Sequence, residues 1–436
     1  MYERGFKVGK QKLILIPSIR MDSNKKDDRN ENGLVRMSKV SRDIMGFKNK
    51  VELYPNSSAE DRLRGSVLLD IFHAFSSDIE EARTSGISEE ELSRVGFVTT
   101  KTYNRILGAG NKKPNTIWIT EDINDTVVGA DPEFLLFDKN NRVVRANSVL
   151  SFTSPIGCDG AMAEIRPKPA ISPEEIMDNI LTLLTNKGYT DPIKDFSWMA
   201  GCYYKDDIRD YPIGGHIHIG NPVKVAEIPM EKRMGLFKSL NKILDELLAI
   251  PMIKIDGDDL GRARRTESAM GKYGFFGEFR PHQGRLEYRT LSGMWLMHPK
   301  LTKMVFGVTK AIVDEVYRHI ANKDFNLEYM FPKFLEKEKI WSPGFDGWDK
   351  IPLVNDIGCV CNSDIMINTL NTSSASKITA KFLNSWFSRM KKLSTYKMYS
   401  EYIDELYEVL KNKPSVFQKC NKNIQNNWLE GAEFLK

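Results

Sequence analysis

The chain has 436 residues, of which 41% are apolar, 28% charged and 10% aromatic. This length exceeds that of one typical compact domain, and the apolar content is enough for a sizeable core, which excludes a wholly disordered protein. Lys and Arg number 63 against 58 Asp and Glu. Positive charge is therefore not concentrated as in a dedicated nucleic-acid-binding protein, and we expect no nucleic-acid partner.

The apolar pattern contains neither a membrane segment nor a secretion signal. No apolar run reaches the roughly 18–20 residues that a membrane helix needs, and residues 1–7 lack the apolar core of a signal peptide. The five cysteines are scattered without a Cys-x-x-Cys pair, which favours incidental thiols over a zinc or redox site. We therefore expect a soluble, cytoplasmic protein.

Residues 1–120 have the pattern of a small α+β domain, and they contain no motif that assigns it a role. A helix is predicted over 66–82, where apolar residues recur on one stripe. Polar, turn-rich segments predict loops at 24–33 and 108–114. Runs of β-branched and aromatic residues predict strands at 12–16, 51–54, 97–100 and 116–120.

Residues 121–300 are predicted to form a catalytic core in which strand-like segments carry polar, chemically capable residues. One intervening helix begins at the N-cap Ser172, has Glu175 in a capping box and is predicted to end at a left-handed Gly188. A second helix is predicted over 234–250 and ends at Pro251. The predicted strands cover 127–138, 160–167, 214–220 and 285–290.

Residues 301–436 are predicted to be a helical extension of this core. Apolar residues recur at helical spacing over 300–320, and two more helices are predicted over 375–394 and 396–412. The last helices are basic and aromatic. A solvated Lys face explains this pattern better than a nucleic-acid-binding patch does.

Asp131 and Glu133 form the first pair of chemically capable residues. On a strand, residues i and i+2 point to the same side, and their Cα atoms are roughly 7 Å apart. The carboxylates of Asp131 and Glu133 would therefore lie side by side. Two such charges repel, and burying them without compensation is costly, which invites a cation between them. The alternative is an Asp-Pro turn followed by a solvated Glu133.

His216 and His218 repeat this geometry with imidazoles. They are two of only six histidines, and they follow the paired glycines Gly214 and Gly215, which permit close approach to the backbone. The spacing fits neither a cupin nor the first strand of an amidohydrolase barrel, and it is compatible with a phosphate and divalent-metal site. The alternative is a hydrogen-bonded pair on a half-buried strand.

Glu287 and Arg289 form a same-face pair of opposite charge, which by itself could be a simple ion pair. Arginines and glycines are interleaved before this pair, and arginines grip phosphate or carboxylate in a bidentate way. Glu164 adds another strand carboxylate. A set of carboxylate ligands favours Mg²⁺ or Mn²⁺ over zinc. Carboxylates together with arginines and a glycine-rich cleft are typical of phosphoryl transfer.

The order of these motifs resembles the phage-encoded carboxylate–amine ligases (COOH-NH2 ligase type 2), distant relatives of glutamine synthetase and glutamate–cysteine ligase. The resemblance covers roughly residues 125–300. Its motifs are Gly-Ala-Asp-Pro-Glu-Phe at 129–134, Gly-Cys-Asp-Gly at 157–160, Glu-Ile-Arg-Pro at 164–167, Gly-His-Ile-His-Ile-Gly at 215–220, Tyr-Gly at 273–274, Arg280, and Glu-Tyr-Arg at 287–289. Asp131 departs from the pattern, because the larger family often has Glu there.

The resemblance implies a glutamine synthetase-like α+β fold: a curved antiparallel sheet with outer helices, accompanied by the N-terminal α+β unit and the helical C-terminal region. It implies ATP and Mg²⁺ (or Mn²⁺) as cofactors. The implied metal ligands are Asp131, Glu133, Glu164, Glu287 and His216. The implied nucleotide-binding residues are His216, His218, Tyr273 and Arg280, and the implied catalytic residues are Arg280, Glu287 and Arg289.

The implied reaction is ATP-dependent amide-bond formation through an acyl phosphate, joining a small-molecule or peptide carboxylate to an amine. Two alternatives stay open: a non-catalytic phage virion or interaction protein that retains the ligase fold, and a related ATP-dependent phosphotransferase. The family implies a phage gene, and hence host cytoplasm or association with the phage particle. A homo-oligomer is compatible with the resemblance, which names neither substrate.

Overall fold

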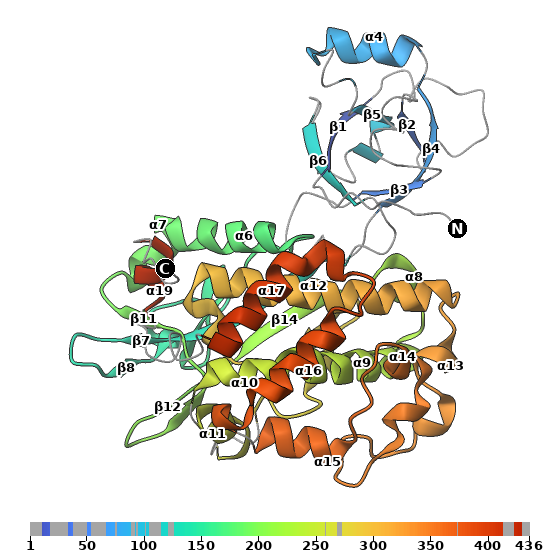
Figure 1. Cartoon of the computed structure of the whole chain (residues 1–436). Coiled ribbons are helices and arrows are strands. Elements are labelled where there is room, and N and C mark those ends of the chain that lie inside the picture. Colours follow the sequence, from blue (N-terminus) through green and yellow to red (C-terminus); the bar gives the residue numbers. More distant parts are fainter. Residues whose placement is uncertain are drawn as a thin grey trace. The chain divides into compact units, whose positions relative to one another are not determined.

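The computed structural model divides the chain into two compact units, Met1–Asp125 and Thr126–Lys436. The structure describes residues 11–17, 34–37, 50–53, 67–74, 76–88, 92, 95–100, 102–103, 115–120, 126–257, 259–267, 273–372, 374–412 and 423–429. Within these ranges, no helix has the length and apolar character needed to cross a membrane. Figure 1 shows the first unit in blue and cyan and the second in green to red.

The first unit is a closed barrel of six strands in the order β1-β5-β2-β4-β3-β6. The four strands predicted from the sequence are confirmed as β1, β3, β5 and β6, with ends shifted by one or two residues, whereas β2 and β4 were not predicted as strands. The bounds of the six strands are β1 (Gln11–Pro17), β2 (Leu34–Met37), β3 (Lys50–Leu53), β4 (Val67–His73), β5 (Val95–Val98) and β6 (Asn115–Thr120).

The prediction of one helix over 66–82 is wrong in its first half. Val67–His73 is the strand β4, which pairs with both β2 and β3, and the helix α4 (Ser76–Thr84) begins only after it. A short apolar run cannot be assigned to helix or strand by periodicity alone. Here the backbone pairing with β2 and with β3 makes the segment a strand. The loops predicted at 24–33 and 108–114 lie outside the described residues.

The second unit is built on an antiparallel sheet in the order β15-β16-β14-β7-β10-β9, with β8 and β11 also paired to β7. An α+β architecture with an antiparallel sheet and outer helices is thus confirmed. The strands are β7 (Val128–Phe137), β8 (Val143–Val144), β9 (Ile156–Asp159), β10 (Met162–Ile165), β11 (Ser197–Met199), β14 (Gly215–Gly220), β15 (Phe279–Pro281) and β16 (Arg285–Tyr288), and a separate hairpin joins β12 (Tyr203–Lys205) to β13 (Asp210–Pro212).

The two faces of this sheet differ in chemistry because side chains alternate along each strand. One face belongs to a continuous apolar core shared with the helices; its strand members include Val128, Ala130, Phe134, Leu136, Ala163, Ile165, Ile217, Ile219, Leu286 and Tyr288. The residues between them point to the other face, which therefore carries Asp131, Glu133, Glu164, His216, His218 and Glu287 together.

Helices that precede residue 300 and helices that follow it pack on the apolar face of the sheet, and they share one core with it. The longest is α12 (Pro299–Asn322), which packs against α6, α9 and α17. The helices predicted around 375–394 and 396–412 are confirmed as α16 and α17. The other main helices are α6 (Pro173–Thr185), α9 (Met230–Leu244), α10 (Ile250–Asp256), α11 (Leu260–Thr266), α16 (Ala380–Met390) and α17 (Tyr396–Asn412).

The short helical segments lie mainly in the connections. They are η3 (Ala146–Ser148), α7 (Lys187–Thr190), η4 (Asp191–Ile193), α8 (Val223–Ala226), η6 (Gly293–Met297), α13 (Leu327–Met330), η7 (Lys333–Leu335), η8 (Gly347–Lys350), α14 (Pro352–Asp356), α15 (Ser363–Met366), the π-turn η9 (Ile367–Asn371), η10 (Ala375–Lys377) and α19 (Ile424–Leu429).

Two predicted helix ends are wrong. Gly188 does not supply a left-handed stop; it lies inside the short helix α7, and α6 ends at Thr185 with Asn186 as an extended C-cap. Pro251 does not end its helix either. The π-turn η5 (Asp245–Ala249) widens the helix just before it, and Pro251 then sits in the first turn of α10, where a missing N–H is tolerated.

Glu315 on α12 anchors the start of α17 and gives a stability prediction. Burial opposes its ionisation, but hydrogen bonds from His319, Ser394 and Thr395 lower the pKa of Glu315 to about 2. Its ordinary value is 4.5. A carboxyl whose pKa falls on folding stabilises the protein above its unfolded pKa, and this contribution is lost as pH falls toward the folded pKa.

We therefore expect Glu315→Gln to cost on the order of 3 kcal/mol of unfolding free energy at pH 7, and progressively less between pH 4.5 and 2. Urea denaturation of both proteins across this pH range measures the difference. The exposed Glu336, replaced by Gln, is the matched control. A destabilisation that does not change with pH would show that packing, rather than the carboxylate charge, accounts for the effect.

Candidate active site

Asp131 lies between the two histidines of the neighbouring strand. The register of β7 and β14 places Asp131 opposite His216. One carboxylate oxygen, Oδ1, is 3.1 Å from His216 Nδ1, and the other, Oδ2, is 3.0 Å from His218 Nε2. Burial alone would raise the pKa of Asp131, but the charges and hydrogen bonds of the two histidines hold it well below its ordinary value. Asp131 is therefore an ionised carboxylate at neutral pH.

Glu287 is the buried centre of a cationic cluster on β15 and β16. Its side chain is 2% exposed, and Oε1 lies 3.8 Å from His216 Nδ1. Arg289 pairs with Oε1, Arg280 Nη1 donates to Oε2 at 3.2 Å, and His282 Nε2 lies 2.9 Å from Oε2. Burial opposes ionisation, but these partners hold the pKa of Glu287 below its ordinary value.

Arg289 is fixed beside Glu287 by three contacts. Its Nε donates to Glu278 Oε1 at 3.0 Å, and Nη1 donates to Glu287. Its guanidinium lies 5.3 Å from the centre of the Tyr273 ring, on which Arg264 also stacks at 4.9 Å. Arg289 is therefore a rigid donor, whereas the Arg280 side chain is 57% exposed and can adapt to a ligand.

Glu133 occupies the next position on the site face of β7 and accepts two hydrogen bonds. Gly214 N donates to Oε2 at 2.5 Å, and the Tyr273 hydroxyl donates to Oε1 at 3.0 Å. His216 Nε2 lies 2.8 Å from the same hydroxyl. Burial raises the pKa of Glu133 above its ordinary value. Tyr273 thus couples this carboxylate to the histidine that faces Asp131.

Gly214 is required by the site itself. A Cβ at this position would lie 2.5 Å from His216 Nε2 and 2.7 Å from the Tyr273 hydroxyl oxygen. Any side chain would therefore displace the groups that hold Glu133. The sequence predicted that Gly214 and Gly215 permit close approach to the backbone, and in the structure other groups of the protein make that approach; at Gly215 these are the Ser292 carbonyl and the Trp295 indole.

Glu164 on β10 lies directly opposite Glu133 in the strand register. It pairs with Arg166, which also donates to the Ser154 carbonyl at 2.9 Å. Burial raises the pKa of Glu164 to about 8, and the charges of Asp131 and Glu133 add to this rise against the opposing charge of Arg166. Glu133 and Glu164 form a pair of carboxyls, and a nearby cation would stabilise the ionised form of both.

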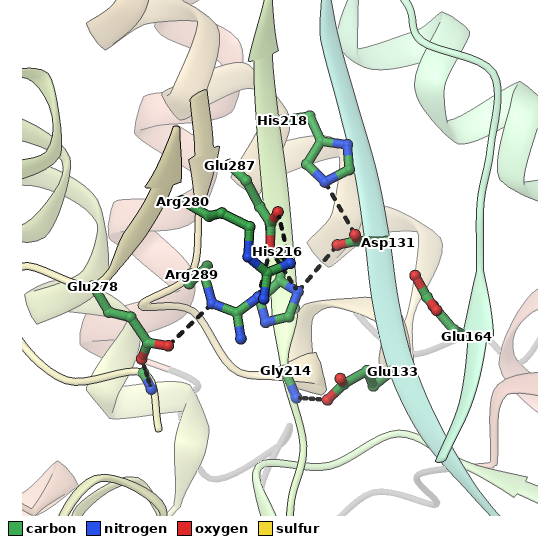
Figure 2. Close-up of polar contacts among 12 residues, drawn as sticks. Asp131, Glu133, Glu164, Gly214, His216, His218, Glu278, Arg280, Glu287 and Arg289 are labelled. Carbon is green, nitrogen blue, oxygen red and sulfur yellow. Dashed lines mark hydrogen bonds and ion pairs between the residues drawn. The ribbon is translucent and has the colours of Figure 1, made fainter. Parts of the chain in front are cut away.

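Three of the predicted metal ligands converge closely. One atom each of Asp131, His216 and Glu287 lies within 4.8 Å of the other two. Figure 2 shows Glu133 and Glu164 beside Asp131, on the side away from Glu287. All nine residues singled out from the sequence are thus on one sheet face or against it: Asp131, Glu133, Glu164, His216, His218, Tyr273, Arg280, Glu287 and Arg289.

Sequence reasoning missed two polar residues of this cluster. His282 contacts Glu287 from the turn between β15 and β16, and Glu278 orients Arg289 while also accepting a hydrogen bond from Gly274 N. His282 could have been noticed, because it is one of six histidines and lies between strands that both carry site residues. Nothing in the local sequence pattern marks Glu278.

A search of curated proteins finds no match to the chain. A bifunctional glutathione synthetase from Pasteurella multocida is similar in structure with a TM-score of 0.32 and 11% identity, over 66% of this chain and 52% of that one, so this chain spans about half the length of that protein. Residues 128–341 match the family described as phage phiEco32-like COOH.NH2 ligase-type 2, and this range contains every residue of the cluster. The resemblance to the COOH-NH2 ligase type 2 family that the sequence motifs indicated is therefore confirmed over these residues.

Proposed function

We propose that the protein is an ATP-dependent carboxylate–amine ligase that forms an amide bond through an acyl phosphate on a glutamine synthetase-like sheet. The observation that carries this proposal is the convergence of Asp131, His216 and Glu287 next to fixed arginines, within the part of the chain that matches the ligase family. Buried carboxylates and guanidiniums around one point are what a metal–phosphate complex needs.

The donor set fits a divalent cation. Tyr273 donates its hydroxyl proton to Glu133, so its oxygen accepts from His216 Nε2–H. That fixes the ring so that Nδ1 faces Asp131 and Glu287. Nδ1–H donates to Asp131 in the structure, and a bound cation would replace that proton. Two carboxylates and one imidazole suit Mn²⁺ or Mg²⁺. Cations bound here, and between Glu133 and Glu164, would neutralise phosphate charge.

We place the nucleotide at the end of β14 that follows His218, because buried polar groups lie there. Gly220 pairs with Arg285 at that end of β14. Arg285 Nε and both side-chain atoms of Asn221 are buried there without a hydrogen-bond partner among the described residues. Such orphaned groups are rare in folded proteins and favour a polar ligand. The sugar and base of ATP would satisfy them, with the phosphates toward Arg280 and Arg289.

The proposed chemistry has two steps. An oxygen of the substrate carboxylate attacks the γ-phosphorus, ADP leaves, and an acyl phosphate forms. The amine nitrogen then attacks the acyl carbon, loses a proton and displaces phosphate. Arg289, held by Glu278 and Glu287, stabilises the charge that grows on the transferring phosphoryl group. No side chain has to serve as a covalent nucleophile.

The test is phosphate release by the full chain with Mg–ATP and mixtures of carboxylates and amines. We expect phosphate to appear only when a suitable acid and amine are both present, together with an amide product by mass spectrometry. Phosphate transfer to one substrate without amine would identify a phosphotransferase instead. The absence of Mg–ATP binding would favour a virion or interaction protein, although retention of so many buried carboxylates is costly for a site without function.

A further inference from the structure

A cavity of about 360 Å³ lies on the same sheet face as the candidate active site. Leu135 and Phe137 line it, and they follow Asp131 and Glu133 on β7 at alternate positions. Alternate residues of a strand share one face and follow each other at roughly 7 Å, so the cavity lies in line with the carboxylates of Asp131 and Glu133. Ile213 also lines it and directly precedes Gly214, which donates to Glu133. The cavity therefore begins one side chain away from Glu133.

The walls of the cavity are aromatic and uncharged. Tyr203 and Tyr204 of the hairpin β12–β13 line it, and the rings of Phe137 and Tyr204 meet edge to face at 5.1 Å between centroids. Met199 closes the side formed by β11. Figure 1 shows β8, β11 and β12 gathered at this end of β7. No charged side chain lines the cavity within the described part of the chain, so it cannot hold phosphates or a free carboxylate by ion pairing.

The hairpin that forms one wall is braced, so the cavity is preformed. Asp206 closes its turn by accepting hydrogen bonds from the backbone N–H groups of Ile208 and Arg209, each at 2.8 Å. The Tyr211 hydroxyl donates to the same carboxylate at 3.1 Å, and the Tyr211 ring lies 6.1 Å from that of Tyr204. A preformed apolar cavity of this size next to polar catalytic groups is typical of a site for part of a small molecule.

We infer that this cavity receives the aromatic side group of the carboxylate or amine substrate, so that the enzyme selects a substrate with a ring attached to the reacting group. The inference rests on the proposed ligase function. The nucleotide is placed at the opposite end of β7, where Asn221 and Arg285 have buried polar atoms without partners among the described residues. Rings pack favourably on Phe137 and the tyrosines, while Asn141 and Ser197 at the rim offer hydrogen bonds.

The probes for the test are L-phenylalaninamide and hydrocinnamate, with L-alaninamide and propionate as counterparts that lack the ring. Binding to the full chain is measured by ligand-observed NMR titration. We expect at least one aromatic probe to bind about tenfold or more tightly than its counterpart, and the one that binds identifies whether the cavity serves the amine or the acid. Equal binding of probes with and without the ring would overturn the inference.

Ser197 is an exposed residue at the rim, so Ser197→Trp should fill the cavity without disturbing the fold. We expect it to weaken the aromatic probe about tenfold and to leave binding of a fluorescent ATP analogue with Mn²⁺ unchanged. Tyr203→Leu, which removes a wall ring, should weaken the same probe. Thr182→Trp, on the exposed face of α6, is the control and should change neither.

If Ser197→Trp weakens the nucleotide instead of the aromatic probe, the cavity belongs to the base of ATP and the inference is wrong. If the wild-type chain fails to bind the nucleotide with Mn²⁺ but binds the aromatic probe, the proposed function fails while the cavity keeps its ligand class. The two proposals therefore fail through different readouts.

Discussion

Replacement of Arg289 by Lys is expected to lower turnover by roughly 10²–10³, by analogy with the loss of one oxyanion-hole donor. The guanidinium is held in one orientation by Glu278, Glu287 and the Tyr273 ring. A planar fork can grip two phosphoryl oxygens at once, and an ammonium cannot. The charge and most of the stem are kept, so the melting temperature should change little. Steady-state kinetics and thermal unfolding of the same variant measure both quantities.

The competing view makes Arg289 a structural partner of Glu278 and Glu287. In that case the loss would appear in melting temperature, with turnover near normal, and Arg289 would leave the site. Arg145→Lys, at an exposed position outside the cluster, is the matched control for the exchange itself and should alter neither quantity.

Replacement of Asp131 by Asn is expected to abolish most divalent-cation binding and to reduce ligase activity by roughly 10³ or more. Asp131 is the carboxylate that touches both histidines and shares the three-donor cluster with His216 and Glu287. An amide keeps the shape but removes the charge that attracts the cation. Titration with Mn²⁺, followed by electron paramagnetic resonance, measures the affinity directly.

The matched control is Asp178→Asn on the exposed face of α6, which removes one negative charge outside the site. It should bind Mn²⁺ like the unmodified chain. If Asp131→Asn and Asp178→Asn bind Mn²⁺ equally well, the Asp131, His216 and Glu287 cluster is an ion-pair network and the metal assignment is wrong.

The alternation of side chains along strands made most of the site predictable. Asp131, Glu133, His216 and His218 occur at i and i+2, so their shared face followed from the strand assignment alone. The sequence could not predict that β14 lies between β7 and β16, because strand order is set by pairing between distant segments. That order is what brings Glu287 within 3.8 Å of His216.

The missed and incorrect predictions have one physical cause. The local sequence pattern does not determine which contacts form between segments that are distant in the sequence. His282 and Glu278 lie in a turn and a loop, where no period fixes the direction of a side chain. The strand β4 was predicted as helix because its apolar run is short, and pairing on two sides overrode the pattern. Pro251 was predicted to break a helix that the π-turn before it allows to continue. The glutamine synthetase likeness of the sheet stays a prediction.

Crystals of the full chain grown with Mn²⁺ and a non-hydrolysable ATP analogue test the central claim most directly. Anomalous diffraction at the manganese edge should show a peak between Asp131, His216 and Glu287, with the analogue's terminal phosphate against Arg280 and Arg289. Under saturating Mn²⁺, the absence of such a peak, with the contact of Asp131 to both histidines intact, would contradict the account.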